Sequence, residues 1–160
     1  MDKITPCLWF KDGAAEAAAG FYVSLLPDSR IDRIVASPAS TPSTAEGDTV
    51  VVEFTLAGRS YMALNGGEFG FAPNMSVSFS VDCDDQAEVD RLWAAILGSG
   101  GAEVQCGWIT DRWGYPWQIV PRVMTQLLGD PDRAKAKRAM TAMMTMVKLD
   151  IAEIEAAAQG

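Results

Sequence analysis

The stretch CGWITDRWGYPWQIVP, from Cys106 to Pro121, carries more information about the fold than any other part of the chain. It holds three of the five tryptophans, Trp108, Trp113 and Trp117. Two runs typical of strands flank Asp111–Pro116, where Gly and Pro supply turn geometry. We therefore predict a tight hairpin whose bulky aromatic side chains form one wall of a pocket.

Composition places the chain among packed globular proteins. Its 160 residues suit one domain with a real core, since 49% are apolar and only 21% are charged. The net charge of −8 argues against nucleic acid as a partner, because binding a phosphate backbone needs clustered Lys and Arg. The one basic cluster is interpreted as the solvated face of a helix: Arg133, Lys135, Lys137 and Arg138.

The chain is expected to work in the cytoplasm, with no membrane partner. Asp2 and Lys3 lead straight into a strand-like run, so no signal peptide is predicted. No apolar stretch approaches the ~20 residues of a membrane span. Three cysteines without a CxxC spacing fit unpaired thiols in a reducing compartment. Histidine, the commonest general base and metal ligand, is absent from the whole sequence.

Hydrophobic periodicity predicts a strand, a helix and three more strands in the first half of the chain. The expected elements are a strand Thr5–Phe10, a helix opened by Asp12-Gly13 and ended by Pro27, a strand Ile31–Ala36, a mobile loop Ser37–Asp48, and a hairpin of Val50–Leu56 and Ser60–Asn65 across Ala57-Gly58-Arg59. The predicted buried stripe of the helix is Ala14, Ala17, Ala18, Phe21, Tyr22 and Leu25.

The same order of elements begins again after Gly66-Gly67. The expected elements are a strand Met75–Asp82, a helix capped by Asp85 and Glu88 and stopped at Gly98, and strands Glu103–Trp108 and Trp117–Val120, with Trp108–Asp111 also paired. The helix stripe is Val89, Leu92, Trp93, Ile96 and Leu97. The repeat predicts an α+β fold of two modules, about 1–67 and 74–122, within a domain covering 1–128.

The remaining residues, 129–160, are predicted to form a helical extension that packs on the domain or on a partner subunit. Asp130-Pro131 supplies an N-cap and a proline at the first helical position, and Asp150 with Glu153 indicates a second cap. We expect two short helices with a break near Lys148–Asp150. One apolar stripe runs through them, interpreted as core or subunit packing: Met140, Met143, Met144, Val147, Ile151 and Ile154.

Several motifs in this order resemble the PhnB-like family of the vicinal oxygen chelate superfamily, which also contains glyoxalases and extradiol dioxygenases. They are Ile4–Phe10, Phe21-Tyr22, Ala63–Gly67, Cys106–Trp108, Asp111–Gly114 and Trp117–Pro121. The resemblance implies two βαβββ modules whose curved mixed sheets surround a cleft, as in glyoxalase and bleomycin resistance proteins, and it implies a homodimer. Members often carry the name 3-demethylubiquinone-9 3-methyltransferase.

The superfamily cleft usually holds a divalent metal, with His, Gln or Glu as ligands. By strand register those positions fall here on Thr5, on Ala63 or Asn65, on Ser76 and on Gln118. Neutral hydroxyl and amide oxygens hold a transition metal poorly, so we expect no metal and no other cofactor. Glu53 and Glu68 are the nearby carboxylates that could compensate.

Side-chain alternation predicts what the cleft presents instead. Ser76, Ser78 and Ser80 share one face of their strand, while Val77, Phe79 and Val81 should face the helix layer. The same alternation predicts which side chains of the first half face the cavity. They are Thr5, Cys7 and Trp9 on the first strand, Glu53 and Thr55 on the third, and Tyr61, Ala63 and Asn65 on the fourth. The candidate ligand-binding residues are Thr5, Cys7, Trp9, Glu53, Tyr61, Asn65, Ser76, Ser78, Trp108, Arg112, Trp113 and Gln118. The alternative is that they only fill a small sheet interior.

Two of these residues raise a question of chemistry. Cys7 is a possible nucleophile, but without an imidazole base its thiol stays protonated, so a small buried hydrophobe is the favoured interpretation. Arg112 could contact an anionic group of a substrate or form a salt bridge within the hairpin.

Three functions are therefore open. The favoured one is a homodimeric protein that binds a small organic molecule, aromatic or quinone-like, in a metal-free cleft. The family name implies methyl transfer from S-adenosylmethionine instead, although no GxGxxG turn is present. The superfamily implies a metal-dependent lyase or dioxygenase, which the residues at the ligand positions disfavour.

Overall fold

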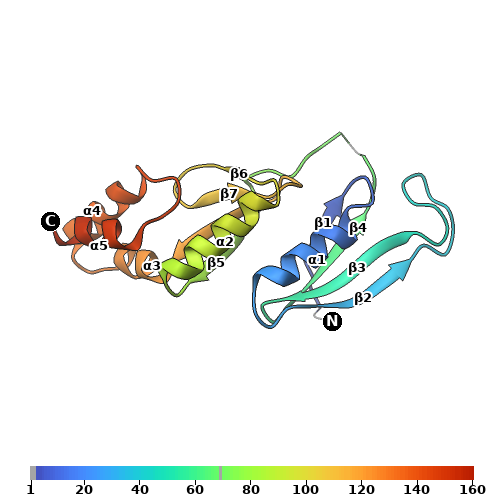
Figure 1. Cartoon of the computed structure of the whole chain (residues 1–160), viewed down its shortest axis with the longest axis horizontal. Coiled ribbons are helices and arrows are strands. Elements are labelled where there is room, and N and C mark those ends of the chain that lie inside the picture. Colours follow the sequence, from blue (N-terminus) through green and yellow to red (C-terminus); the bar gives the residue numbers. More distant parts are fainter. Residues whose placement is uncertain (1–2, 69) are drawn as a thin grey trace. The chain divides into compact units, whose positions relative to one another are not determined.

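The computed structural model describes residues 3–68 and 70–160. They divide into two compact units, residues 1–71 and 72–160, each built from the order β-α-β-β-β (Figure 1). This repeat confirms the predicted α+β fold of two modules. Of the helices in the described part of the chain, none has both the length and the hydropathy that a bilayer span requires.

The first unit is a four-stranded sheet with one helix against it. Its elements are β1 (Cys7–Phe10), α1 (Ala15–Leu25), β2 (Arg30–Ala36), β3 (Thr49–Leu56) and β4 (Arg59–Asn65). The strand order is β1-β4-β3-β2, with β1 parallel to β4 and the other pairs antiparallel. The helix covers one face of the sheet because its alanine-rich stripe allows a close approach to β3.

The stripe that α1 buries is rotated relative to the predicted one. Ala15, Ala18, Ala19, Tyr22 and Leu25 are buried, whereas Ala17 is exposed and Ala14 and Phe21 are only half-buried. Tyr22 meets Phe54 of β3, with 6.3 Å between the ring centroids. The helix begins at Ala15, where the Asn65 Oδ1 accepts a hydrogen bond from the Ala15 N–H at 2.9 Å. A side chain from the end of β4 therefore caps α1.

Two connections of the first unit differ from the sequence prediction. The β3–β4 hairpin is confirmed, but its loop contains two residues rather than three, Ala57 and Gly58, with φ values of 47° and 76°. Both values fit a type I′ turn. The loop predicted as mobile, residues 37–48, is closed by hydrogen bonds from Ser37 N to Asp48 O (2.8 Å) and from Gly47 N to Ser37 O (2.9 Å).

The second unit repeats this topology. Its module contains β5 (Phe79–Cys83), α2 (Gln86–Gly98), β6 (Ala102–Glu103), β7 (Trp108–Thr110) and β8 (Pro116–Pro121). The strand order β5-β8-β7-β6, with β5 parallel to β8, matches the first sheet position for position. The first strand begins at Phe79 and not at Met75 as predicted, because Met75 and Ser76 form a turn.

Helix α2 confirms the predicted cap and stripe. The Asp85 carboxylate accepts a hydrogen bond from Glu88 N at 2.8 Å, and the Glu88 carboxylate accepts one from Asp84 N at 2.8 Å. Val89, Leu92, Trp93 and Ile96 are buried, while Leu97 is half-buried. They form the core of this module with the buried side chains of β7 and β8, which are Ile109, Trp117 and Ile119.

Three helices follow β8 and form what we call the C-terminal extension, residues 122–160: α3 (Arg122–Leu128), α4 (Arg133–Met143) and α5 (Ile151–Gln159). Helix α3 was not predicted. The N-cap of α4 is Asp132 rather than Asp130, whereas the cap of α5 by Asp150 is confirmed. The extension has a core of its own, made of Met124, Leu127, Ala139, Leu149, Ile154 and Ala158.

The methionine stripe of α4 divides between this core and solvent. Met143 packs against the core of the extension. Met140, Met144 and Val147 are exposed by 41%, 61% and 39%. The stripe therefore leaves an apolar surface that the single chain does not cover.

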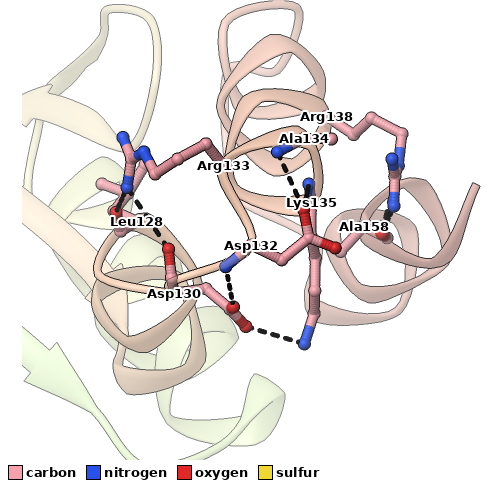
Figure 2. A network of polar contacts seen from close by, with 8 residues as sticks. All are labelled: Leu128, Asp130, Asp132, Arg133, Ala134, Lys135, Arg138 and Ala158. Atoms are coloured by element: carbon pink, nitrogen blue, oxygen red, sulfur yellow. Dashed lines mark hydrogen bonds and ion pairs between the residues drawn. The ribbon is translucent and has the colours of Figure 1, made fainter.

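The basic residues of α4 were predicted to form a solvated face, but several of them make hydrogen bonds and ion pairs within the extension (Figure 2). Arg133 donates to the carbonyl oxygens of Leu128, the last residue of α3, and of Asp130 just beyond it. Arg138 donates to the Ala157 and Ala158 carbonyl oxygens near the end of α5. Lys135 pairs with Asp130 at 2.9 Å, which lowers the pKa of that carboxyl. Three of the four cations thus hold the extension together by satisfying helix C-termini and a carboxylate.

Candidate functional site

Each sheet has a face covered by its helix and an opposite face, which we call the open face. In the second unit, Phe79, Val81, Trp117, Ile119 and Ile109 lie on the helix side, as their ladder pairing requires. Successive side chains alternate between the two faces. The open face of this unit therefore presents the alternate residues of β5, β7 and β8.

A polar row crosses the open face of the second unit. Gln118 in β8 is paired with Ser80 in β5 on one side and with Trp108 in β7 on the other. The Gln118 Nε2 also donates to the Ser78 Oγ at 2.8 Å. Hydroxyl, amide and indole groups thus stand beside one another on three adjacent strands. Ser80 was placed on this face by alternation but was not among the candidate residues.

Ser76 does not belong to this row. It lies before β5, its side chain is exposed, and its backbone N–H donates to the Asn74 Oδ1 at 2.9 Å. Val77, expected against the helix, is 75% exposed. The alternation predicted for Ser76–Val81 therefore holds only from Ser78 onward, because the preceding residues form a turn.

The β7–β8 turn is organised by Asp111, which is only 3% exposed. Its Oδ1 accepts hydrogen bonds from the backbone N–H groups of Trp113 (2.9 Å) and Tyr115 (3.0 Å). Its Oδ2 accepts one from the Trp117 indole at 3.1 Å. One carboxylate thereby sets the path of the chain between the two strands.

The three tryptophans of this hairpin have different surroundings. Trp117 is 1% exposed and stacks on Phe79 on the helix side, with 4.3 Å between ring centroids. It is a core residue and not part of a pocket wall. Trp108 and Trp113 remain half-buried, and the Arg112 guanidinium lies 5.5 Å from the centroid of the Trp113 ring. Arg112 therefore makes a cation–π contact within the turn.

The open face of the first unit contains Cys7 and Trp9 of β1. Their partners in β4 are Met62 and Leu64, which share that face. The Trp9 Nε1 donates to the Gly67 carbonyl oxygen at 2.8 Å, and its ring lies 6.0 Å from Phe71. Sequence analysis missed Met62 and Leu64. Thr5 lies two residues before β1 and is half-buried.

The expectation that Tyr61, Ala63 and Asn65 share the face of Cys7 is wrong. Ala63 and Asn65 pair with Leu8 and Phe10, the buried residues of β1. Tyr61 stacks on Phe54 of β3 with 5.5 Å between centroids. These three side chains therefore point toward the helix layer.

Both the oxygen and the nitrogen of the Asn65 side-chain amide form hydrogen bonds with the backbone. Besides capping α1, it donates from Nδ2 to the Thr49 carbonyl oxygen at 2.8 Å. It also contributes to a pocket of ≈ 390 Å³ between the 37–48 loop and the start of α1, away from the open face. The side chain is 6% exposed, so its hydrogen bonds serve the fold.

Glu53 lies on the open face of the first unit, as predicted, but it is paired. Arg33, its ladder partner in β2, holds both carboxylate oxygens, with N–O distances of 2.9 and 2.5 Å. These hydrogen bonds lower the pKa of the Glu53 carboxyl and raise that of Arg33. Glu68 pairs with Lys11 at 3.3 Å. Both carboxylates that could have compensated for missing metal ligands therefore have a cation beside them.

The described residues, 3–68 and 70–160, contain no group of three His, Cys, Asp or Glu side chains arranged to hold a metal ion. Gln118 is hydrogen-bonded to Ser78, and Asn65 faces the helix. The donor set at the family positions therefore does not fit a transition metal.

Cys7 lacks the surroundings of a nucleophile. Cys7 is exposed, so its interpretation as a small buried hydrophobe is wrong. Partial desolvation still raises the pKa of its thiol, which favours the protonated form. Its neighbour across the ladder is Met62, which has no proton acceptor of useful basicity.

Comparisons with a family model and with solved structures relate the chain to known proteins. The family model described as 3-demethylubiquinone-9 3-methyltransferase matches residues 2–120. A solved structure of the PhnB protein from Bacillus cereus, whose description carries the same enzyme name, is 30% identical with a TM-score of 0.63. The match covers 75% of this chain and 99% of that one.

A solved structure of a protein from Pseudomonas aeruginosa is 23% identical with a TM-score of 0.53, covering 73% of this chain and 95% of that one. At that identity the likeness concerns the fold alone. The search of curated proteins found no match.

Proposed function

We propose a function from the fact that this chain belongs to the 3-demethylubiquinone-9 3-methyltransferase family. The proposed function is to bind a flat organic molecule, aromatic or quinone-like, without a metal ion. The observation that carries the proposal is the row of Ser80, Gln118 and Trp108 on the open face of the second unit. Ser78 extends the row through its hydrogen bond with Gln118.

The row offers the two kinds of contact that a quinone ring needs. The indole of Trp108 supplies an aromatic surface, which favours stacking on a flat ring. Gln118 and the two serines supply donors and acceptors for a ring carbonyl or phenol oxygen. A mostly apolar surface with a few placed polar groups is typical of sites for small organic ligands. On the first unit, Trp9 with Met62 and Leu64 offers a second surface of the apolar kind.

Methyl transfer, which the family name suggests, is the second candidate. In that reaction a phenol oxygen attacks the methyl group of S-adenosylmethionine, the carbon–sulfur bond breaks, and the phenol proton must pass to a base. Desolvation raises the pKa of the Cys7 thiol, and Arg33 holds the Glu53 carboxylate. On the open face of the second unit, the Asp82 carboxylate of β5 lies 3.8 Å from Arg122. The sequence also contains no histidine. Binding without methyl transfer therefore has the better support.

A metal-dependent lyase or dioxygenase reaction is the third candidate, and the donor set argues against it. We expect elemental analysis of the dialysed protein to find no transition metal at one equivalent per chain. One retained equivalent of zinc, nickel or iron would overturn this part of the proposal.

The binding proposal is tested with 2,3-dimethoxy-5-methyl-1,4-benzoquinone and its hydroquinone, followed by quenching of tryptophan fluorescence. Gln118→Leu removes the amide but keeps the side-chain volume, so it should weaken binding about tenfold, the effect of ~1.4 kcal/mol of lost hydrogen bonding. Gln126→Leu, the same change at an exposed position of α3, should leave the affinity unaltered. Equal affinity in the two variants, or no quenching of the unaltered protein, would contradict the proposal.

The same experiment separates binding from methyl transfer. The analogue of the hydroquinone with a hydroxyl in place of one methoxy group, incubated with S-adenosylmethionine, should yield no O-methylated product by mass spectrometry. If such product accumulates in proportion to protein, the chain is a methyltransferase.

A further inference from the structure

The C-terminal extension lies outside the part of the chain that matches the family, since the family model ends at residue 120. The match to the Bacillus cereus chain likewise covers only 75% of this chain. Residues 146–151, which lead from α4 into the first residue of α5, contact the β-α-β-β-β module of the second unit. We call this segment the strap.

The strap binds the backbone just before β7. The N–H groups of Cys106 and Gly107 donate to the carbonyl oxygens of Met146 and Val147, both at 2.8 Å. Cys106 and Gly107 have φ values of 57° and 80°, in the left-handed region. For Cys106, a residue with a Cβ, that conformation is strained and persists only where surrounding contacts impose it. The strap supplies two of those contacts.

Side-chain packing reinforces this attachment. A Cβ on Gly107 would lie 3.0 Å from the Leu149 Cδ1 and 3.0 Å from the Ile119 carbonyl oxygen. Leu149 itself is completely buried and belongs to the core of the extension. The strap therefore connects that core directly to the backbone at Gly107.

Gln86 on the first turn of α2 provides a second anchor. Its Nε2 donates to the Leu149 carbonyl oxygen at 3.2 Å, and its Oε1 accepts from the Ile151 N–H at 2.9 Å. Lys148 pairs with Asp90, one turn further along α2. The strap is thus attached to a helix and to the start of a strand within the same unit.

The anchored backbone leads into the proposed ligand row. Trp108 directly follows Gly107 and pairs with Gln118. The Gly107 carbonyl oxygen accepts a hydrogen bond from Ile119 N at 2.8 Å, so the residue after Gln118 is bonded to the same bend. We propose that the strap is a positioning element, which sets Trp108 relative to Gln118. The inference rests on the proposed function in that these two residues contact the ligand.

Two full-chain variants test the strap. Gln86→Leu removes both hydrogen bonds to the strap with little change in volume, and Leu149→Ala removes its packing on Gly107. Leu127→Ala is the matched control, because Leu127 belongs to the same core but lies on α3. Gln126→Leu is the control for the glutamine change.

The first measurement does not depend on a ligand. The protein is labelled with 5-fluorotryptophan, and the fluorine resonance of Trp108 is identified by its loss in Trp108→Phe. Gln86→Leu and Leu149→Ala should shift or broaden this resonance, whereas Leu127→Ala and Gln126→Leu should leave it in place. The second measurement is the affinity for 2,3-dimethoxy-5-methyl-1,4-benzoquinone, which should fall about fivefold or more in the two strap variants only.

Each outcome has one meaning. An unchanged Trp108 resonance in Gln86→Leu overturns the strap proposal, even if Leu149→Ala fails to fold. A resonance that moves equally in Leu127→Ala also overturns it, because the effect is then general loosening of the extension. A resonance that moves only in the strap variants, with no quinone binding by the unaltered protein, supports positioning of Trp108 and refutes the proposed function instead.

Discussion

Asp111 shows how one buried carboxylate organises a turn that sequence analysis attributed to Gly and Pro. Three N–H groups converge on it, two from the turn backbone and one from the Trp117 indole. The sequence indicated where the chain bends, since Gly114 and Pro116 are local signals. It did not indicate that Asp111 would be buried, because burial depends on the strands that the turn joins.

Replacement of Asp111 by Asn should therefore destabilise the protein. The asparagine amide keeps one acceptor oxygen, but its NH₂ group would face one or more of the N–H donors that now bind the carboxylate. Hydrogen bonds to a charged acceptor are therefore lost. We expect the free energy of unfolding to fall by about 2–3 kcal/mol in urea denaturation. Asp48→Asn, at an exposed position, is the control and should change it by less than about 0.5 kcal/mol. A loss in Asp111→Asn no larger than in the control would refute the role of the carboxylate.

Cys83 gives a second prediction at the residue scale. Burial raises the pKa of its thiol to about 12, with the Glu88 carboxylate as a smaller cause. The thiolate is the reactive form, so the native thiol should not react at pH 8. In the double variant Cys7→Ala/Cys106→Ala, Ellman's reagent should detect no thiol in the native protein. One thiol should appear after unfolding in guanidinium chloride. Rapid reaction of the native variant would contradict this account.

At the scale of elements, the β3–β4 hairpin explains why the predicted face of β4 was wrong. The sequence prediction used a three-residue loop, which would pair Thr55 with Tyr61 and Glu53 with Ala63. The structure has a two-residue loop, so Thr55 pairs with Ser60 and Glu53 with Met62. A shift of one residue moves every side chain of a strand to the other face. Alternation within β4 was visible in the sequence, but the length of its turn was not.

The same hairpin offers a test of its turn type. Ala57 has φ 47°, which is strained for alanine but is readily adopted by asparagine at this position of a type I′ turn. Ala57→Asn should stabilise the protein by about 0.5–1 kcal/mol, seen as a rise of a few degrees in Tm by circular dichroism. Ala39→Asn, in the exposed part of the 37–48 loop, should leave Tm unchanged. A lower Tm for Ala57→Asn would contradict the assigned turn.

Helix ends were predictable where the signal is local in sequence and were missed where it is not. The caps Asp85 and Asp150 were predictable because each acts on a backbone N–H three residues away. The cap at Asp132 was missed because Asp130-Pro131 carries the stronger local signal, while Asp130 is used by Lys135. Helix α3 was missed because its seven residues are too few for a clear period.

At the scale of the whole molecule, the doubled module was predictable from sequence. Local sequence signals indicated the same order of strands and helices in each half of the chain. The order of the strands within the two sheets is also the same. The shared position of Gln118, Trp108 and Ser78 on the open face was also predicted, whereas their contact with a ligand stays a proposal. The strap was not predicted, because its partners are 40 or more positions away and the bonds involve backbone atoms.

The homodimer expected from the sequence stays a prediction, and the structure refines its test. Met143 faces the core of the extension, so the informative change is Met140→Asp/Met144→Asp, which charges only the exposed part of the stripe. Light scattering at micromolar concentration should report a dimer for the unaltered protein and a monomer for this variant. Thr141→Asp, an exposed change on the same helix, should remain dimeric. A monomeric unaltered protein would end the proposal.

The strap also has a consequence for the order in which the chain is made. Gln86 and Ile151 are 65 positions apart, so the ribosome releases α2 and β7 well before the residues that hold them. During that interval the backbone at Cys106 and Gly107 has only its own sheet to keep it in a left-handed bend. Folding of the second unit therefore cannot be completed until residues 146–151 have been made, because Leu149 belongs to the core that Met124 and Leu127 form.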